Sequence, residues 1–190
     1  MRRVILASTS PRRRELFKKL NIPFEIIASD YAEDMTLALP PRKLAMHLAR
    51  GKAEAVARMH DDAIVVGADT FLVFEGRVIG KPRDAKEAAR MLGALSGKAH
   101  TILTGFAVID SADRRDVGGV EEARVYFKAL SSGDISGYIE SGEPLDKAGA
   151  YAIQGMGAKF IDRIEGDYDA IVGLPVERIK EALQEFGILA

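Results

Sequence analysis

The chain begins with a short apolar run that leads directly into the signals for a helix start, and this order constrains the fold. Val4–Ala7 is continuously apolar, as expected for a strand that is buried on both faces of a sheet. Ser10 suits the N-cap and Pro11 the first helical position, so we expect a helix from there to about Leu20. A strand that leads into a helix is the repeating unit of layered α/β proteins.

Strands and helices are expected to alternate along the rest of the chain. Apolar or alternating segments predict strands at 24–28, 63–70, 100–109 and about 122–127, and a β-hairpin over 71–82 that turns at Glu75-Gly76. Periodicity and capping signals predict helices at about 41–59, 85–95, 134–140 and 176–186, the last closed by Gly187. The stretch 110–119 is expected to be a polar turn. The alternation favours an α/β or α+β sheet protein, and 190 residues suit one domain, with room for two lobes.

Composition excludes several classes of function. Lys plus Arg (27) nearly balance Asp plus Glu (28), which argues against a broad basic surface for duplex nucleic acid and requires any anion site to be local. Cysteine is absent from the sequence, so disulfides, thiolate zinc sites and a cysteine nucleophile are excluded. The three histidines are too scattered for a metal triad, so a divalent ion would use oxygen ligands, which points to Mg²⁺ or Mn²⁺.

The sequence also predicts a soluble, cytoplasmic protein. The apolar stretch near the N-terminus is far shorter than the core of a signal peptide and runs into more arginine. No apolar run approaches the roughly 20 residues that span a bilayer. We therefore expect no contact with a membrane.

Three arginines, Arg12, Arg13 and Arg14, stand in the first turn of the expected helix, where the helix dipole repels cations. They could form a solvated basic helix end. Alternatively, helix N–H groups and guanidinium groups could bind a phosphate there. Arg13 continues the apolar stripe of the helix and is expected to point inward, whereas Arg14 is assigned to solvent.

A carboxylate, Asp69, interrupts the apolar strand 63–70 where that strand is expected to end. Ligands of open α/β sheets bind beyond the carboxyl ends of strands, so Asp69 and the turn Ser8–Arg13 are expected to share a crevice. Asp69 could equally be a turn residue. Lys52, on the margin of the apolar face of its helix, either extends its amine to solvent or serves a site. Glu33 and Lys81 taken singly are more typical of solvated positions.

Four blocks considered together resemble the Maf family of nucleoside triphosphate pyrophosphatases. These are "LASTSPRRREL", "VGADTFLVFEGRVIGKPRD", "MLGALSGKAHTILTG" and "GEPLDKAGAYAIQGMGAKFIDRIEGDYDAIVGLP". The resemblance runs from Leu6 to Pro175 without a large gap. One departure is the loss, around Ala123, of a common threonine before the Val-x-Phe strand, which affects only local packing.

The resemblance implies an α/β fold of two lobes, with a mixed twisted sheet flanked by helices and a central cleft, related to inosine triphosphate pyrophosphatase. The chain would form a single domain, residues 1–190, and a homodimer. The implied reaction hydrolyses the α–β phosphoanhydride of a nucleoside triphosphate to the monophosphate and pyrophosphate, with Mg²⁺ or Mn²⁺. The implied general base is Asp69, the metal residues are Glu33 and Asp69, and the substrate residues are Ser8, Arg12, Arg13, Lys52, Thr70, Lys81 and Gln154.

Three positions distinguish two branches of this family, and here they hold Arg12, Thr70 and Gln154. This set resembles the branch that hydrolyses dTTP and UTP, with CTP and modified pyrimidine nucleotides as further candidates. The branch that acts on 7-methyl-GTP would carry a bulky aromatic residue, Gln and Glu instead. A non-catalytic regulator of cell division that binds nucleotide or nucleic acid is the alternative from another class, although the near-neutral charge weighs against it.

Overall fold

The structure, a computed structural model, describes residues 2–190. The chain divides into two compact units. Unit 1 contains the residues up to Thr70, Thr104–Glu121 and Asp169–Ala190, and unit 2 contains Phe71–Leu103 and Glu122–Tyr168. Among residues 2–190, none of the helices is long and apolar enough to span a membrane.

The strands form a mixed sheet, which confirms the expected α/β class. They are β1 (Arg3–Leu6), β2 (Glu25–Ile26), β3 (Ala63–Phe74), β4 (Arg77–Ile79), β5 (Ala99–Asp110), β6 (Asp116–Phe127) and β7 (Ile161–Glu165). Their order is β2-β1-β3-β5-β6-β7, with β4 paired to β3. The β1 strand is parallel to both β2 and β3, whereas β4 and β7 pair antiparallel with β3 and β6. The long strands β3, β5 and β6 contribute residues to both units.

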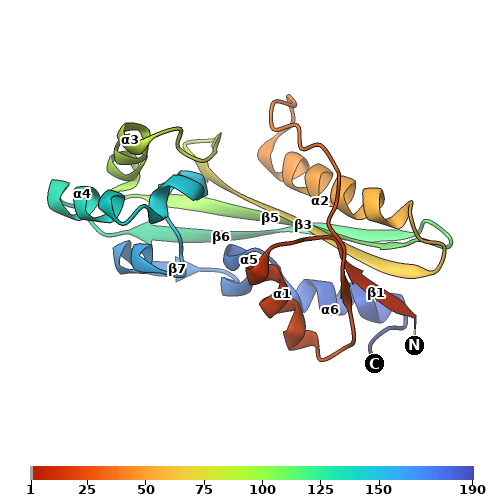
Figure 1. The fold of residues 1–190 in the computed structure, drawn as a ribbon. Coiled ribbons are helices and arrows are strands. Elements are labelled where there is room, and N and C mark those ends of the chain that lie inside the picture. The colour runs from red at the N-terminus through yellow and green to blue at the C-terminus, as the bar shows by residue number, and fades with distance from the viewer. Residues whose placement is uncertain (1) are drawn as a thin grey trace. The chain divides into compact units, whose positions relative to one another are not determined.

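Helices cover both faces of the strands in unit 1 (Figure 1). The helix α2 (Pro41–Ala57) lies on one face, and α1 (Pro11–Phe17) and α6 (Val176–Glu185) lie on the other. The short helix α5 (Tyr168–Val172) precedes α6 in the chain. The α1 helix begins as expected, because the Ser10 hydroxyl accepts a hydrogen bond from the Arg13 N–H at 3.5 Å and Pro11 occupies the first turn.

Small residues allow α2 to lie unusually close to the sheet. A Cβ atom at Gly67 of β3 would lie 2.5 Å from the carbonyl oxygen of Ala49 and 2.9 Å from the Cβ atom of Ala53. On β5, a Cβ atom at Gly105 would collide with the backbone of Ala45. Because helix and strand are in direct backbone contact here, side chains on the margin of α2 reach the sheet without crossing a thick apolar layer.

Unit 2 packs two helices and three short turns of 3-10 helix around an aromatic cluster. The helices are α3 (Ala85–Leu95) and α4 (Ser132–Glu140), and the turns are η2 (Glu143–Asp146), η3 (Ala148–Ala150) and η4 (Met156–Phe160). The α4 helix starts with the expected capping box of Ser131 and Asp134. The cluster contains His100, Phe127, Tyr138, Tyr151 and Phe160.

Several element boundaries differ from the sequence predictions. The strand expected at 63–70 continues to Phe74, because residues after Thr70 pair with β4 across the expected turn at Glu75-Gly76. The polar turn expected at 110–119 is shorter, since β6 already begins at Asp116. The strand expected at 24–28 has only two residues in ladder pairing. Both β7 and α5 lie in segments for which the sequence predicted no element.

The buried imidazole of His100 makes the stability of the protein sensitive to acid. Its Nε2 atom lies 2.7 Å from the Tyr151 hydroxyl, and its Nδ1 atom is buried with no hydrogen-bond partner among residues 2–190. Burial lowers the pKa of His100 to about 4. The unfolded chain, with a histidine pKa of about 6.5, therefore takes up this proton first as the pH falls.

We predict that about 3 kcal/mol of the free energy of unfolding is lost through His100 between about pH 6.5 and pH 4. Urea unfolding at a series of pH values would measure it in the wild type and in His100→Gln, whose amide can still meet the Tyr151 hydroxyl. Carboxylates titrate equally in both proteins, so the difference curve isolates His100. A difference independent of pH would contradict the prediction.

Candidate active site

The centre of the candidate site is one ammonium group held between two carboxylates. Lys52 Nζ lies 2.5 Å from Asp69 Oδ1 and 2.8 Å from Glu33 Oε1. The side chains of Lys52 and Asp69 are only 12% and 9% exposed, whereas Glu33 is 45% exposed. The Lys52 ammonium therefore does not extend to solvent, whereas its service in a site stays a prediction.

Asp69 lies within β3 and not at its end, which corrects the position expected from the sequence. The neighbouring strand β1 stops earlier, since Leu6 pairs with Val66 and the last bond of this ladder joins the Ala7 N–H to the Val66 carbonyl oxygen. Asp69 thus lies beyond the carboxyl end of β1, although β3 itself continues. The rule that ligands bind beyond the carboxyl ends of strands therefore holds here for β1 and not for β3.

Burial dominates the electrostatics of Asp69. It raises the pKa of this carboxyl above its usual value, and the repulsion from Glu33 acts in the same direction. The attraction and hydrogen bond of Lys52, together with the charge of Arg13, oppose the rise. Asp69 is therefore a buried carboxyl group of increased basicity, whose charged form is favoured by its cationic neighbours against burial.

Arg13 points inward, as the apolar stripe of α1 predicted. Its Nε atom donates to the Gly173 carbonyl oxygen at 2.9 Å, and an Nη atom is 3.5 Å from Thr70 Oγ1. Burial lowers the pKa of Arg13, while Asp69 and Glu33 counteract that effect. An arginine keeps its charge at neutral pH despite such a shift. Arg13 and Asp69 thus lie in one electrostatic neighbourhood of unit 1.

Thr70 belongs to a chain of hydroxyl groups in unit 1. Its Oγ1 atom lies 2.9 Å from the Thr104 hydroxyl, which donates to the Ala170 carbonyl oxygen at 2.7 Å. Thr104 was not identified from the sequence, and neither was Gly173, whose φ of 135° suits glycine alone. The Val-Gly-Leu-Pro motif was the only local signal for Gly173, since glycine often marks an unusual backbone conformation.

The remaining residues of the α1 turn have different surroundings. The buried Ser8 hydroxyl accepts a hydrogen bond from the Ser10 N–H at 3.2 Å, so it shapes the turn before the helix. The Arg12 side chain is exposed and makes no hydrogen bond among residues 2–190. Arg14 is also exposed, as expected. Of the three arginines, Arg13 is the one held by protein groups, and Arg12 has its guanidinium available to a ligand.

Tyr31 positions Glu33, a role for which the sequence offered no signal. Its ring lies directly on Gly51 of α2, where any Cβ atom would collide with it, and its hydroxyl lies 3.1 Å from His47 Nε2. Gly51 is adjacent to Lys52. The tyrosine therefore anchors the acidic loop to α2 at the point where Glu33 must meet the lysine ammonium.

Lys81 and Gln154 belong to unit 2. Lys81 follows β4, and its ammonium forms an exposed ion pair with Asp146 at 2.7 Å. Gln154 lies in an exposed position between η3 and η4. The structure describes each unit by itself, so the joint action of these two residues with Asp69 stays a prediction.

The two carboxylates suit a divalent cation only with additional ligands from elsewhere. Among residues 2–190 there is no group of three or more His, Cys, Asp or Glu side chains that could hold a metal ion. Glu33 and Asp69 supply oxygen donors that converge on one point, now neutralised by Lys52. Mg²⁺ commonly binds through one or two carboxylates, with waters and phosphate oxygens as the other ligands. The donor set fits such an ion.

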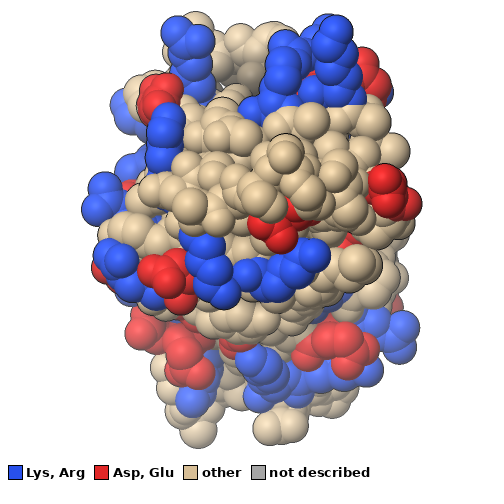
Figure 2. Space-filling model, turned by 90° about the vertical axis from the view of Figure 1, so that its left-hand side faces the viewer, with Lys and Arg blue, Asp and Glu red and all other residues tan. Residues whose placement is uncertain are grey.

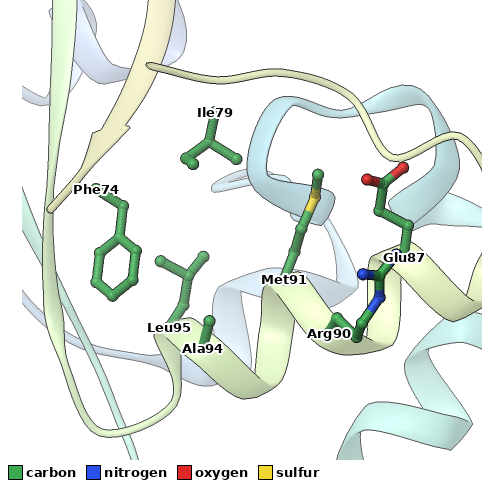
Figure 3. Close-up of a pocket in the computed structure, with 7 residues that line it drawn as sticks. All are labelled: Phe74, Ile79, Glu87, Arg90, Met91, Ala94 and Leu95. Atoms are coloured by element: carbon green, nitrogen blue, oxygen red, sulfur yellow. The ribbon is translucent and has the colours of Figure 1, made fainter. Parts of the chain in front are cut away.

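Unit 2 also contains a small pocket of about 200 Å³, shown in Figure 3. Apolar side chains from the β3–β4 hairpin and from α3 face its interior, with Glu87 and Arg90 at one end. Its lining residues are Phe74, Ile79, Glu87, Arg90, Met91, Ala94 and Leu95. Ligand sites typically enclose about 300 to 1,000 Å³. This pocket is too small for a nucleotide and contains none of the predicted site residues.

Known proteins similar to this chain cover nearly all of its length. A dTTP/UTP pyrophosphatase of Pelotomaculum thermopropionicum is 47% identical over 98% of this chain and 98% of its own. One of Alkaliphilus oremlandii is 48% identical over 97% and 96%. The Staphylococcus aureus Ham1 protein has a similar fold, with a TM-score of 0.54 at 14% identity over 97% of this chain and 99% of that one.

The family comparison covers the segments that contain the candidate site. The model of the family described as Maf-like protein matches residues 3–186, a range that includes the α1 arginines, Glu33, Lys52 and Asp69. With this match and with relatives almost half identical over their full length, the chain belongs to the Maf family.

Proposed function

We propose that this protein hydrolyses dTTP and UTP between the α and β phosphates, releasing the nucleoside monophosphate and pyrophosphate. The observation that carries the proposal is the Lys52 ammonium between Asp69 and Glu33, with Arg13 in the same electrostatic neighbourhood. Relatives that bear the name dTTP/UTP pyrophosphatase support the choice of reaction and substrate.

Substrate binding is proposed to use positively charged side chains, some exposed and some fixed by hydrogen bonds to the protein. A triphosphate is strongly anionic, and guanidinium groups bind phosphate oxygens in pairs. Arg13 is fixed by the Gly173 carbonyl group, which orients its remaining N–H groups, while Arg12 is exposed. Lys81 of unit 2 would add a further positive charge, and Ser8 would keep the α1 turn in shape.

Asp69 is proposed as the general base. Its carboxylate takes a proton from a water molecule while the water oxygen bonds to one of the two phosphorus atoms that the anhydride joins. The bond from that phosphorus to the bridging oxygen breaks, and the electron pair leaves with the departing phosphate group. Because burial raises the pKa of Asp69, it is a stronger base than an exposed aspartate, yet Lys52 still favours its charged form.

Glu33 and Asp69 are the residues that would hold Mg²⁺ or Mn²⁺, because they present converging carboxylate oxygens. When bound, the ion would neutralise charge on the phosphate oxygens. The flexible four-carbon stem of Lys52 would also allow its ammonium to contact a phosphate oxygen without a change in α2.

Base selection is proposed to depend on Arg12, Thr70 and Gln154, the set that favours pyrimidine triphosphates over 7-methyl-GTP. A nucleic-acid-binding regulator is not favoured by any specific observation. On the side that carries α3 and α4, Lys and Arg side chains are interspersed with Asp and Glu (Figure 2), whereas nucleic-acid surfaces concentrate basic residues. The homodimer, the cytoplasmic location and the single domain with a central cleft are part of the same proposal.

Turnover of a nucleotide panel tests the function directly. With Mg²⁺ or Mn²⁺, we expect pyrophosphate and the monophosphate from dTTP and UTP, and a lower kcat/KM for CTP and for 7-methyl-GTP. The ratio of kcat/KM values measures the discrimination between substrates. Orthophosphate as the primary product, or the absence of turnover, would refute the proposal.

Asp69→Asn is expected to reduce kcat by about 10²- to 10⁴-fold, the range for loss of a general base. Binding of dTTP should persist, because the arginines and Lys52 remain. Steady-state kinetics and equilibrium dialysis would measure the two effects. Asp61→Asn, at an exposed position before β3, is the matched control. Wild-type turnover by Asp69→Asn would remove Asp69 from the role of base.

Lys52→Met is expected to move the acidic limb of the pH profile of kcat/KM to higher pH. The ammonium is the main influence that lowers the pKa of Asp69 against its burial, so its loss raises that pKa further and leaves the base protonated up to a higher pH. Lys43→Met, an exposed position on α2, is the control. An unchanged acidic limb, or a shift to lower pH, would show that Lys52 does not set the basicity of Asp69.

A further inference from the structure

The backbone on both sides of Gln154 is held by two side chains that the family comparison does not single out. The Ala152 N–H donates to the Tyr138 hydroxyl at 3.2 Å, and the Met156 N–H donates to Glu143 Oε2 at 3.1 Å. These two bonds lie two residues before and two residues after Gln154. The Gln154 side chain itself is exposed.

Glu143 accepts three hydrogen bonds that only a carboxylate can accept together. Besides the Met156 N–H, its Oε1 atom accepts from the Tyr138 hydroxyl at 2.7 Å and from the Gly157 N–H at 3.2 Å. Partial burial alone would raise the pKa of Glu143, but these donors lower it below its usual value. An amide in its place would turn an NH₂ group toward at least one of the donors.

The two glycines that follow Gln154 give room to the Glu143 carboxylate and the Tyr138 phenol. A Cβ atom at Gly155 would lie 2.7 Å from Glu143 Oε2, and one at Gly157 would lie 2.6 Å from the Tyr138 hydroxyl oxygen. Gly155 also has a φ of 131°, which L side chains rarely adopt. The segment is therefore shaped to receive the carboxylate and the phenol.

The short turn η2 links this segment to Lys81. Glu143 begins η2, and Asp146 at its end pairs with the Lys81 ammonium at 2.7 Å. Nearby, the Gly149 N–H donates to the Gly80 carbonyl oxygen at 3.0 Å. The Lys81 ammonium and the backbone that follows Gln154 thus both contact carboxylates of one four-residue turn.

We propose that Glu143 and Tyr138 are positioning residues for substrate selection: they hold residues 152–157 in the one conformation in which Gln154 meets the nucleobase. The inference rests on the proposed function for its substrate. Glu143 acts through the backbone and has no contact with the reacting atoms. Its loss is expected to impair discrimination between bases more than the chemical step.

The test compares Glu143→Gln with the wild type and with Glu140→Gln, the same change at an exposed position on α4. We expect amide hydrogen exchange in residues 152–157 to accelerate in Glu143→Gln, and the ratio of kcat/KM for dTTP over ATP to fall by about 10-fold, as for loss of a charged hydrogen bond. The fall should arise mainly from an increase in KM for dTTP. Glu140→Gln should change neither.

Tyr138→Phe keeps the buried ring and removes the hydroxyl, so it provides a second variant should Glu143→Gln fail to fold. It should accelerate the same exchange and reduce the same ratio. Wild-type exchange and wild-type selectivity in either folded variant would overturn the inference. The absence of nucleotide turnover by the wild type would instead refute the proposed function and with it the substrate selected, while the exchange measurement would still decide whether Glu143 holds the segment.

Discussion

The interaction on which the site depends is the Lys52 ammonium placed between two carboxylates, one of them nearly excluded from water. A buried aspartate next to another acid would take up a proton, and it would then serve neither as a base nor as a ligand for a cation. Lys52 opposes this proton uptake, with Arg13 as a second positive neighbour. The ammonium reaches Asp69 within β3 because α2 lies close to the sheet.

Small residues at the contacts of α2 with the sheet and with the acidic loop allow this close approach. Gly67 and Gly105 on the strands meet alanines of α2, and Gly51 on α2 accepts the Tyr31 ring. Each contact removes a side-chain layer that would otherwise separate two elements. The helix consequently lies close enough for Lys52 to reach Asp69, and the acidic loop lies close enough for Glu33 to reach Lys52. In this unit, the ion pairs of Lys52 therefore depend on the close packing of α2.

In unit 2, close packing against glycines holds a backbone segment instead of an ion pair. There, Glu143 and Tyr138 supply fixed acceptors for the backbone on both sides of an exposed glutamine, and glycines give them room. Under the proposed function, Arg13, Lys52 and Asp69 of unit 1 would serve the phosphates and the water molecule, and unit 2 would add the Lys81 ammonium and the Gln154 amide.

The sequence by itself determined the local elements and the types of chemistry. The starts of α1, α3 and α4 follow from caps that act within three residues, and the family resemblance implied roles for Asp69, Lys52 and Glu33. Only the tertiary structure decided that β3 continues past Asp69, that Tyr31 fixes the acidic loop, and that Gly173, 160 residues away, holds Arg13. Capping and periodicity report interactions over a few residues, whereas these contacts join distant segments, and their partners are chosen by how closely the folded backbones approach.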